Sequence, residues 1–353
     1  MKKKKQTTGV KEIARRAGVS IATVDRVLHK RPGVSPSTKR RIERIIKDMD
    51  YKPNVIASRL ASRKKLNFAV LIPEISEYTD FWQAPLNGIK RAEEMVKEYG
   101  IIVDLYFFNL NDRSFFEEQA NKILEDNPDG VLLAPSFIQE ARRFTKKCHE
   151  KKIPYVLIDS NIPHQEGLCY IGPHLFRSGF LGGQLMHFTL NSESDILVMN
   201  IAREMDDHNY LTEIEDGFRG YFRYNNLYHN ILKSEVTLTD YHSIESELDQ
   251  VFKKNSSLKG IFVTNSRVAA VARYLEENQK KHISLIGYDF LSENIEYLKR
   301  EVIDMLICHK PEEQGYKGIM TLYRHLLLEE SIDRIHFMPI DIVTKENYEF
   351  YNN

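Results

Sequence analysis

Short apolar runs alternate with helical stretches through almost all of residues 66–345. The strand candidates are Asn67–Ile72, Ile102–Phe108, Gly130–Ala134, Tyr155–Asp159, Asp195–Asn200, Gly260–Thr264 and Ile283–Gly287. The helical stretches between them include Gln83–Glu98, Phe115–Glu125, Gln139–Lys151, Leu175–Leu190, Val268–Gln279 and Pro311–Glu329. This order predicts an α/β protein whose parallel sheets are covered by helices on both faces, and the number of strands predicts two lobes.

The charge of the chain is divided unequally between its two parts. Residues 1–65 carry a net charge of +15 and the remaining residues a net charge of −15, although the whole chain is neutral. A basic head on an acidic body is typical of a protein that binds a polyanion through the head alone. Double-stranded DNA is therefore the expected partner of the N-terminal part.

Three short helices are predicted within residues 9–52. The apolar spacing of Val10–Ala17 gives the first helix, and Gly18 ends it. Ser20 is a good N-cap for a second helix, Ile21–His29, and Ser35-Pro36 begins a third helix that runs to about Met49. Two short helices joined by a glycine turn and backed by a third form a helix-turn-helix headpiece.

The segment VKEIARRAGVSIATVDRVLHKRPGVSPSTKRRIERIIKDMDYKPN resembles the headpiece of the lactose-repressor (LacI/GalR) family. The resemblance implies that Ile21, Ala22 and Arg26 read bases, with Ser20 and Thr23 near phosphates. Arg26 either donates twice to a guanine or only balances the phosphate backbone. Asp25 stands where serine is usual; an acid there can accept from cytosine or from Arg26, but it repels phosphate.

The same resemblance covers the predicted hinge, residues 53–65. Asn54 can cap a helix over Val55–Ser62, which is too short to be stable alone. In the family this helix folds when it pairs with its twin on operator DNA, and the pattern NxxAxxLA places Asn54, Ala57 and Leu60 at the contact. Leu60 is then either a wedge in the minor groove or an ordinary apolar residue of a linker. The wedge implies a homodimer on a pseudo-palindromic operator.

Candidate ligand-binding residues lie where predicted strands end, the usual place for ligands in open α/β sheets. They are Phe81, Trp82, Asp159, Asn265 and Asp289. Each has a structural alternative: Trp82 can belong to the core, the two aspartates can cap loops, and Asn265 can cap a helix.

The body also resembles the periplasmic sugar-binding-protein fold, in PEISEYTDFWQAPLNGIKRAEE, PYVLIDSN, YIGPHLFRSGFLGGQL, GIFVTNSRVAAVA and SLIGYDFL. That likeness implies a sugar between the lobes, stacked on the two aromatic rings and bonded by the polar residues. Two positions depart from it. Ile214 stands where an arginine is common, and His309 lies near a usual glutamine, where it can bond a hydroxyl or serve a structural role. The identity of the effector stays open.

Other classes of protein are not supported by the sequence. The motifs GxGxxG, GxxxxGK[ST], GxSxG and HExxH are absent, so neither an enzyme nor a cofactor or metal site is expected. Cys148, Cys169 and Cys308 are far apart and read as free thiols of a cytoplasmic protein. No apolar run reaches the about 18 residues of a membrane span, so no membrane partner is expected. A free-standing solute-binding protein is the rival class. Among regulators of the resembled family repression is the default, so a repressor is expected, with activation as the alternative.

The predicted organisation has five parts: a basic tail at 1–8, the headpiece at 9–52, the hinge at 53–65, the effector-binding domain at 66–345 and a C-terminal tail at 346–353. Within the effector-binding domain the first lobe is expected at about 66–162 and 292–328. The second lobe is expected at about 163–291 and 329–345.

Overall fold

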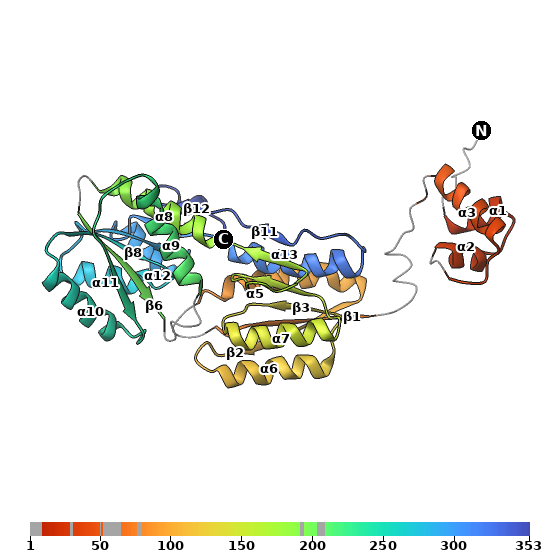
Figure 1. Ribbon diagram of the computed structural model, residues 1–353, viewed down its shortest axis with the longest axis horizontal. Helices are drawn as coiled ribbons and strands as arrows, with labels where there is room; N and C mark the ends of the chain where they lie inside the picture. Colours follow the sequence, from red (N-terminus) through yellow and green to blue (C-terminus); the bar gives the residue numbers. More distant parts are fainter. Residues whose placement is uncertain are drawn as a thin grey trace. The chain divides into compact units, whose positions relative to one another are not determined.

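The computed structural model describes residues 9–28, 31–49, 51, 65–75, 80–190, 194–202 and 209–353. The chain divides into two compact units, Met1–Lys64 and Lys65–Asn353 (Figure 1). The predicted basic tail and residues 53–64 of the predicted hinge lie outside the described residues, and with them the predicted DNA contacts Asn54, Ala57 and Leu60.

The first unit is a three-helix arrangement. Its helices are α1 (Val10–Ala17), α2 (Ile21–Leu28) and α3 (Pro36–Asp48). Gly18 ends α1 in the left-handed conformation, with φ at 62°. Ser35 caps α3 by accepting a 3.3 Å hydrogen bond from the Thr38 N–H, and Pro36 follows in the first turn. The helices enclose a small core of Ile13, Ala14, Ala17, Val24, Val27 and Ile42. The predicted headpiece fold is confirmed.

The second unit contains two six-stranded sheets. The first sheet has the order β11-β5-β4-β3-β1-β2, and all its neighbouring strands are parallel. In chain order these strands are β1 (Leu66–Pro73), β2 (Ile101–Phe108), β3 (Gly130–Leu133), β4 (Tyr155–Ile158), β5 (Cys169–Gly172) and β11 (Ile335–Phe337). One face packs on α6 (Arg113–Asp126) and α7 (Ile138–Glu150). The other packs on α5 (Gln83–Val96), which continues into the 3-10 turn η1 (Lys97–Tyr99), and on α13 (Pro311–Leu326).

The second sheet repeats this plan in the order β12-β10-β9-β8-β6-β7. Its strands are β6 (Asp195–Ile201), β7 (Ile231–Val236), β8 (Leu258–Val263), β9 (Ser284–Tyr288), β10 (Met305–Cys308) and β12 (Asp341–Val343). Only the pair β10–β12 is antiparallel. Helices α10 (Tyr241–Lys254), α11 (Val268–Glu277) and α12 (Ser292–Lys299) cover one face, while α8 (Leu175–Thr189) and α9 (Asn209–Tyr224) cover the other. The predicted two-lobed α/β architecture is confirmed.

The lobes exchange more segments than the sequence predicted. The chain passes between the sheets after β5, after β10 and after β11. The expected boundaries are therefore wrong in three places: β5 and β11 belong to the first sheet, whereas α12 and β10 belong to the second lobe. The reason is physical. Membership of a lobe is decided by strand pairing, such as that of β10 with β9, and alternation along the chain does not report pairing.

Each lobe holds one pair of helices in very close contact. A Cβ added to Gly88 of α5 would lie 1.8 Å from the main-chain oxygen of Glu312, in α13. In the second lobe, a Cβ on Gly179 of α8 would lie 1.9 Å from the main-chain oxygen of Ile214, in α9. Only glycine permits these approaches, because backbone atoms cannot move aside as flexible side chains do. The close contact within each helix pair therefore depends on its glycine.

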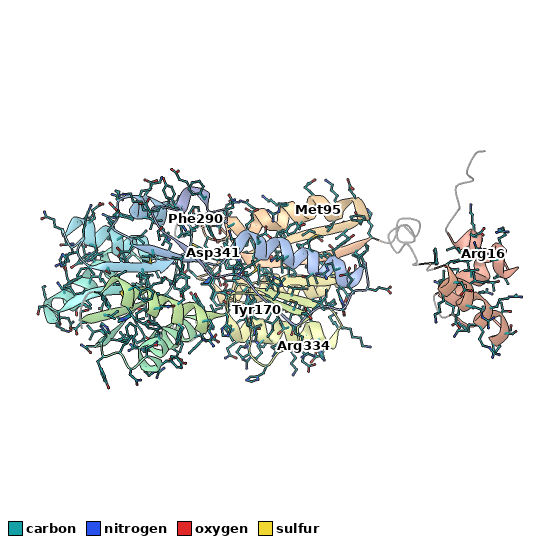
Figure 2. All side chains as sticks on the ribbon, turned by 90° about the horizontal axis from the view of Figure 1, so that it is seen from above. Arg16, Met95, Tyr170, Phe290, Arg334 and Asp341 are labelled. Carbon is teal, nitrogen blue, oxygen red and sulfur yellow. The ribbon has the colours of Figure 1, made fainter. Side chains whose placement is uncertain are left out.

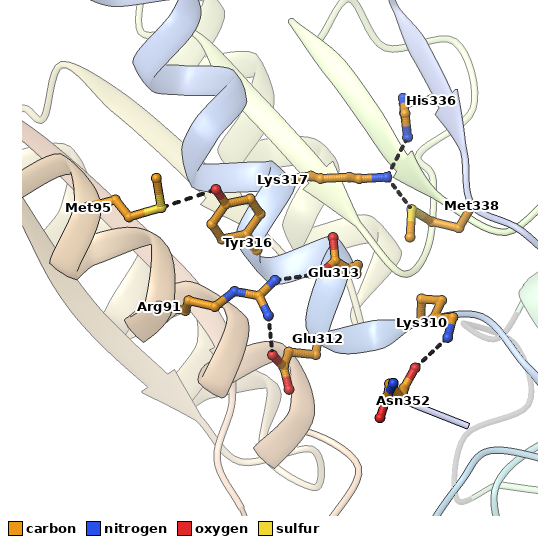
Figure 3. Close-up of polar contacts among 10 residues, drawn as sticks. All are labelled: Arg91, Met95, Lys310, Glu312, Glu313, Tyr316, Lys317, His336, Met338 and Asn352. Atoms are coloured by element: carbon orange, nitrogen blue, oxygen red, sulfur yellow. Dashed lines mark hydrogen bonds and ion pairs between the residues drawn. The ribbon is translucent and has the colours of Figure 1, made fainter. Parts of the chain in front are cut away.

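Polar contacts reinforce the α5–α13 pair and extend to the predicted C-terminal tail (Figure 3). Arg91 forms ion pairs with Glu312 at 2.6 Å and with Glu313 at 2.5 Å. The Lys310 ammonium donates to the main-chain oxygen of Asn352. Lys310 lies on the crossover from β10 to α13, so residues near the end of the chain pack against an interlobe connection.

Candidate functional site

Helix α2 presents a polar face to solvent. Ser20, Ile21, Ala22 and Arg26 are exposed, Thr23 and Asp25 are half-buried, and Val24 and Val27 face the core. The Ser20 hydroxyl accepts the Thr23 N–H at 3.2 Å and lies 2.9 Å from the Thr23 hydroxyl. Ser20 therefore caps α2 as predicted, and the first turn offers two hydroxyls beside the free N–H groups that favour phosphate.

The charged residues of α2 are arranged differently from expectation. The Arg26 side chain makes no hydrogen bond or ion pair with any other described residue, so its guanidinium is available to meet a base edge. Asp25 forms an ion pair with Arg31, at 3.3 Å between Oδ2 and Nη1, rather than with Arg26. Sequence reasoning missed Arg31 because it lies beyond the helix. The only signal in the sequence was an acidic residue, Asp25, in place of the family's serine, with a basic residue, Arg31, six positions later.

Two aspartates end strands of opposite lobes in the second unit. Asp159 follows β4 and Asp289 follows β9, both in the left-handed conformation with φ at 66° and 73°. The Asp159 N–H donates to the Gln314 side chain at 2.9 Å, and the Asp289 N–H donates to the Ile307 carbonyl at 3.0 Å. Non-glycine residues held in this region of backbone space are strained, and such strain concentrates at ligand-binding sites.

These two carboxyl groups are near enough for the charge of one to affect the pKa of the other. Both side chains still touch solvent, but protein surrounds them deeply enough to raise the pKa of Asp159 to about 6. Burial, and then the charge of Asp159, raises the pKa of Asp289 to about 8. Asp159 accepts the Ser160 hydroxyl at 3.2 Å, whereas the Asp289 carboxyl has no hydrogen bond or ion pair within the described ranges. The interlobe space thus holds two carboxyl groups with unused bonding capacity.

Asn265 and two residues that sequence reasoning missed complete this cluster. Asn265 is fixed by its own bonds, donating to the Ile201 carbonyl at 2.7 Å and accepting the Arg267 N–H at 3.2 Å. The Tyr210 phenol hydrogen-bonds the Asn265 side chain, and its pKa is raised by burial and by the charges of Asp159 and Asp289. The nearby charge of Arg267 opposes that rise. Tyr210 lies one helical turn before Ile214, which is buried, and this spacing was the available signal.

The other predicted ligand residues are placed less openly. Phe81 and Trp82 contact edge to face, with ring centroids 5.2 Å apart, just before α5. Trp82 is only 5% exposed, and no hydrogen bond or ring contact among the described residues joins it to the aspartates or to Asn265. Its stacking on a ligand stays a prediction.

His309 lies in the crossover between β10 and α13. Its Nε2 is 2.8 Å from the Ser178 hydroxyl, which also lies 3.0 Å from the Tyr288 hydroxyl. Burial lowers the pKa of His309 to about 3, so the ring is neutral at pH 7. These contacts tie α8 and β9 to the interlobe connection; a bond from His309 to the effector stays a prediction.

Tyr170 of β5 lies beside Asp159, which follows the neighbouring strand β4. The Tyr170 hydroxyl donates to the carbonyls of Asp159 and Pro173, at 3.1 and 2.9 Å. Figure 2 shows Tyr170 and Asp341 in the region where the two lobes adjoin.

Across the described part of the chain, no helix combines the length and the hydropathy needed to cross a bilayer.

Comparison with known proteins agrees with this arrangement. Catabolite control protein A of Staphylococcus epidermidis is 24% identical over 336 residues, which cover 88% of this chain and 99% of that protein. The protein of the same name in Staphylococcus aureus (strain N315) is 30% identical over 155 residues, 44% of this chain and 45% of that protein.

Solved structures give the same result. A protein of Bacteroides fragilis assigned as a LacI transcriptional regulator has a TM-score of 0.76 and 30% identity, over 82% of this chain and all of that one. GanP, a glucose-galactose binding protein of Geobacillus stearothermophilus, has a TM-score of 0.70 at 19% identity, over 80% of this chain and 99% of that one. The second likeness concerns the fold alone.

Two family descriptions match the chain directly. Residues 68–330 match the periplasmic binding protein domain. Residues 9–54, which contain the exposed helix α2, match bacterial regulatory proteins of the lacI family. This chain therefore belongs to the LacI family of DNA-binding regulators, with a periplasmic-binding-protein domain as its effector domain.

Proposed function

We propose that this regulator senses a sugar or sugar derivative held between the two lobes, and that the ligand controls its affinity for operator DNA. The observation that carries the proposal is the pair Asp159 and Asp289. They come from strand ends of opposite lobes, interact electrostatically, and keep bonding capacity in a partly desolvated space. A ligand bonded to both would hold the lobes together.

The chemistry of the cluster suits a polyhydroxylated ligand. Carboxylates accept hydrogen bonds from neighbouring hydroxyls, and the Tyr210 phenol can both donate and accept. With its pKa near 8, Asp289 is available as a donor and as an acceptor around neutral pH. Arg267 supplies a positive charge close to Tyr210, whereas the resembled fold often has an arginine at the position of Ile214. Structural neighbours at under 25% identity include proteins solved with D-arabinose and D-fucose, which supports a carbohydrate.

On the DNA side we propose a cytoplasmic homodimer that acts as a repressor on a pseudo-palindromic operator. The exposed face of α2 supplies one half-site contact, and a second copy supplies the other. The names of the catabolite control relatives support a regulatory role of this kind. Activation by the same machinery is the alternative. It would appear as operator binding that raises transcription in a purified system.

The ligand proposal is tested by calorimetric titration of the full-length protein with neutral monosaccharides, oligosaccharides and their acidic derivatives. For a sugar that binds, Asp289→Asn should weaken affinity roughly tenfold, because the amide replaces one of the two carboxyl oxygens that can accept from the ligand. Asp129→Asn is the matched control. Asp129 accepts the Asn67 N–H at 2.9 Å, just before β3 and so at the opposite edge of the first sheet from Asp159.

Two results would contradict the proposal. One is a sugar bound equally well by the wild type and by Asp289→Asn, which would place the site elsewhere. The other is a ligand of a different class, found in a wider screen, whose affinity depends on Asp289.

A further inference from the structure

Helix α2 carries one acidic residue within a head that is otherwise strongly basic. Asp25 lies on the same helix as the exposed Arg26, and its side chain is 46% exposed. A carboxylate that approaches a duplex meets the phosphate charges and weakens binding unless a positive group neutralises it. Long-range electrostatics alone therefore predicts that removing this acid strengthens DNA binding.

The structure gives Asp25 such a partner. Arg31 lies just beyond the C-terminal end of α2, where its backbone N–H donates to the Arg26 carbonyl at 2.8 Å. The Arg31 Nη1 is 3.3 Å from the Asp25 Oδ2. The arginine is thus held to the helix at two points, through its backbone and through its side chain.

The paired guanidinium keeps most of its capacity to bind. The Arg31 side chain is 64% exposed, although it is paired. A guanidinium has five N–H donors, and the bond to Asp25 uses one of them. Arginine binds phosphate well through the remaining fork of donors. The location, at the edge of the helix that faces DNA, suits a phosphate beside the groove rather than a base inside it.

We propose that Arg31 contacts a backbone phosphate of the bound duplex, and that Asp25 is a positioning residue that holds the Arg31 guanidinium against α2. In this arrangement the acid improves DNA binding, because it orders a cation at the correct edge of the helix before the duplex arrives. The aspartate that replaces the family's usual serine at position 25 then acts in DNA binding by holding Arg31 in place.

The experiment uses full-length protein and two probes: a duplex that the wild type selects from a random-sequence pool, and a scrambled duplex of equal composition. Arg31→Ala should weaken binding to the selected duplex roughly tenfold. It should also lower the slope of log affinity against log salt by about 0.9 for each subunit bound, as expected for one lost phosphate contact. Arg31→Lys keeps the charge and should restore most of the slope.

The decisive variant is Asp25→Ser. With Arg31 present it should weaken binding several-fold, although it removes a negative charge. In the Arg31→Ala background the same change should not weaken binding, because no Arg31 guanidinium remains for Asp25 to hold. This dependence of the Asp25→Ser effect on Arg31 separates positioning from simple repulsion.

Glu43→Ser is the matched control. Glu43 is an exposed acid of the same head, 3.9 Å from Lys39 on α3, and its removal should leave affinity unchanged or slightly stronger. The proposal is overturned if Asp25→Ser strengthens binding in both backgrounds, or if Arg31→Ala leaves the salt slope unchanged. Circular dichroism of each variant checks that the head stays folded; a variant that unfolds is replaced by Asp25→Asn or Arg31→Gln, to which the same criteria apply.

Discussion

Among the described residues, most predicted contact residues of the first unit are exposed, whereas those of the second unit are half-buried or buried. Arg26 on α2 stands in solvent, while Asp159 and Asp289 lie deep enough for burial to shift their pKa values upward. A polyanion is attracted over a distance by charges that remain hydrated. A small ligand with little charge must instead displace water from groups that protein already surrounds. The two units therefore bind by different physical means, and variants should separate them.

The two units also differ in how much space surrounds their glycines. Among the described residues of the head, the core contains six buried side chains, and a Cβ added to Gly18 at the end of α1 would meet no atom within 4 Å. In the body, glycines lie at helix crossings, where Gly88 and Gly179 are in contact with backbone atoms of a neighbouring helix. A side chain at Gly18 would therefore meet no atom, whereas a side chain at Gly88 or Gly179 would overlap the neighbouring helix.

The largest effect is expected from Gly88→Ala. The new methyl group would overlap the Glu312 main-chain oxygen and force α5 away from α13, so the body should lose about 3 kcal/mol of unfolding free energy, measured by denaturant titration. Gly100→Ala is the control. It meets no atom within 4 Å and has only an unfavourable φ of 76°, so it should cost about 1 kcal/mol. Equal losses would show that helix contact is not the limiting factor.

Arg26→Ala should come next. The loss of its contacts should cost on the order of 1–3 kcal/mol of affinity for the selected duplex, measured by fluorescence anisotropy. Sugar affinity should not change, because the residue belongs to the other unit. Arg41→Ala, an exposed arginine on α3, should weaken selected and scrambled duplexes alike. If Arg26→Ala also weakened binding to both duplexes equally, Arg26 would contact the phosphate backbone and would not read bases.

The pH dependence of stability should come third. With its pKa raised to about 8, Asp289 binds more protons in the folded than in the unfolded protein, so unfolding free energy falls as pH rises from about 4 to 8. His309, with its pKa lowered to about 3, has the opposite effect between about 3 and 6.5. Above pH 6.5 the carboxyl effect is therefore separate from that of the histidine.

Thermal unfolding of Asp289→Asn checks this sign. The variant should match the wild type near pH 4 and exceed it at pH 9 by on the order of 1 kcal/mol, after allowance for the partial exposure of the side chain. A saturating sugar should reduce the difference. If the variant is less stable than the wild type at pH 9, the carboxylate is stabilised in the cleft, and the account of its pKa is wrong.

The smallest effect is spectroscopic. Trp82 is the only tryptophan of the chain and is already buried, so a ligand that stacks on it should shift its emission slightly. Operator DNA should leave the emission nearly unchanged, unless DNA binding and lobe closure are coupled. Trp82→Phe should retain sugar binding with modestly reduced affinity, because an aromatic face remains. A sugar that is detected by calorimetry without any change in emission would assign Trp82 to the core.

Much of this molecule is predictable from local patterns. The helix boundaries of the head follow from Gly18, Ser20, Ser35 and Pro36, because caps and turns depend on neighbouring residues alone. The central strands of both sheets were also predictable, because a strand buried on both faces reads as an apolar run. The strands that were missed, β5, β7, β10, β11 and β12, are each either short or at an edge. An example is β7, whose sequence ILKSEV alternates with polar residues on an exposed edge.

The sequence by itself determined the kinds of element, the basic head, the DNA-facing helix and the strand ends that carry Asp159, Asn265 and Asp289. Tertiary structure alone decided which strands pair, and therefore that β5 and β10 lie in the lobes opposite to those expected. It also decided that Tyr210 and Arg267 join the aspartates, and that Asp25 pairs with Arg31. The reason is that periodicity and capping act between near neighbours, whereas pairing, burial and pKa shifts depend on residues that only folding brings together.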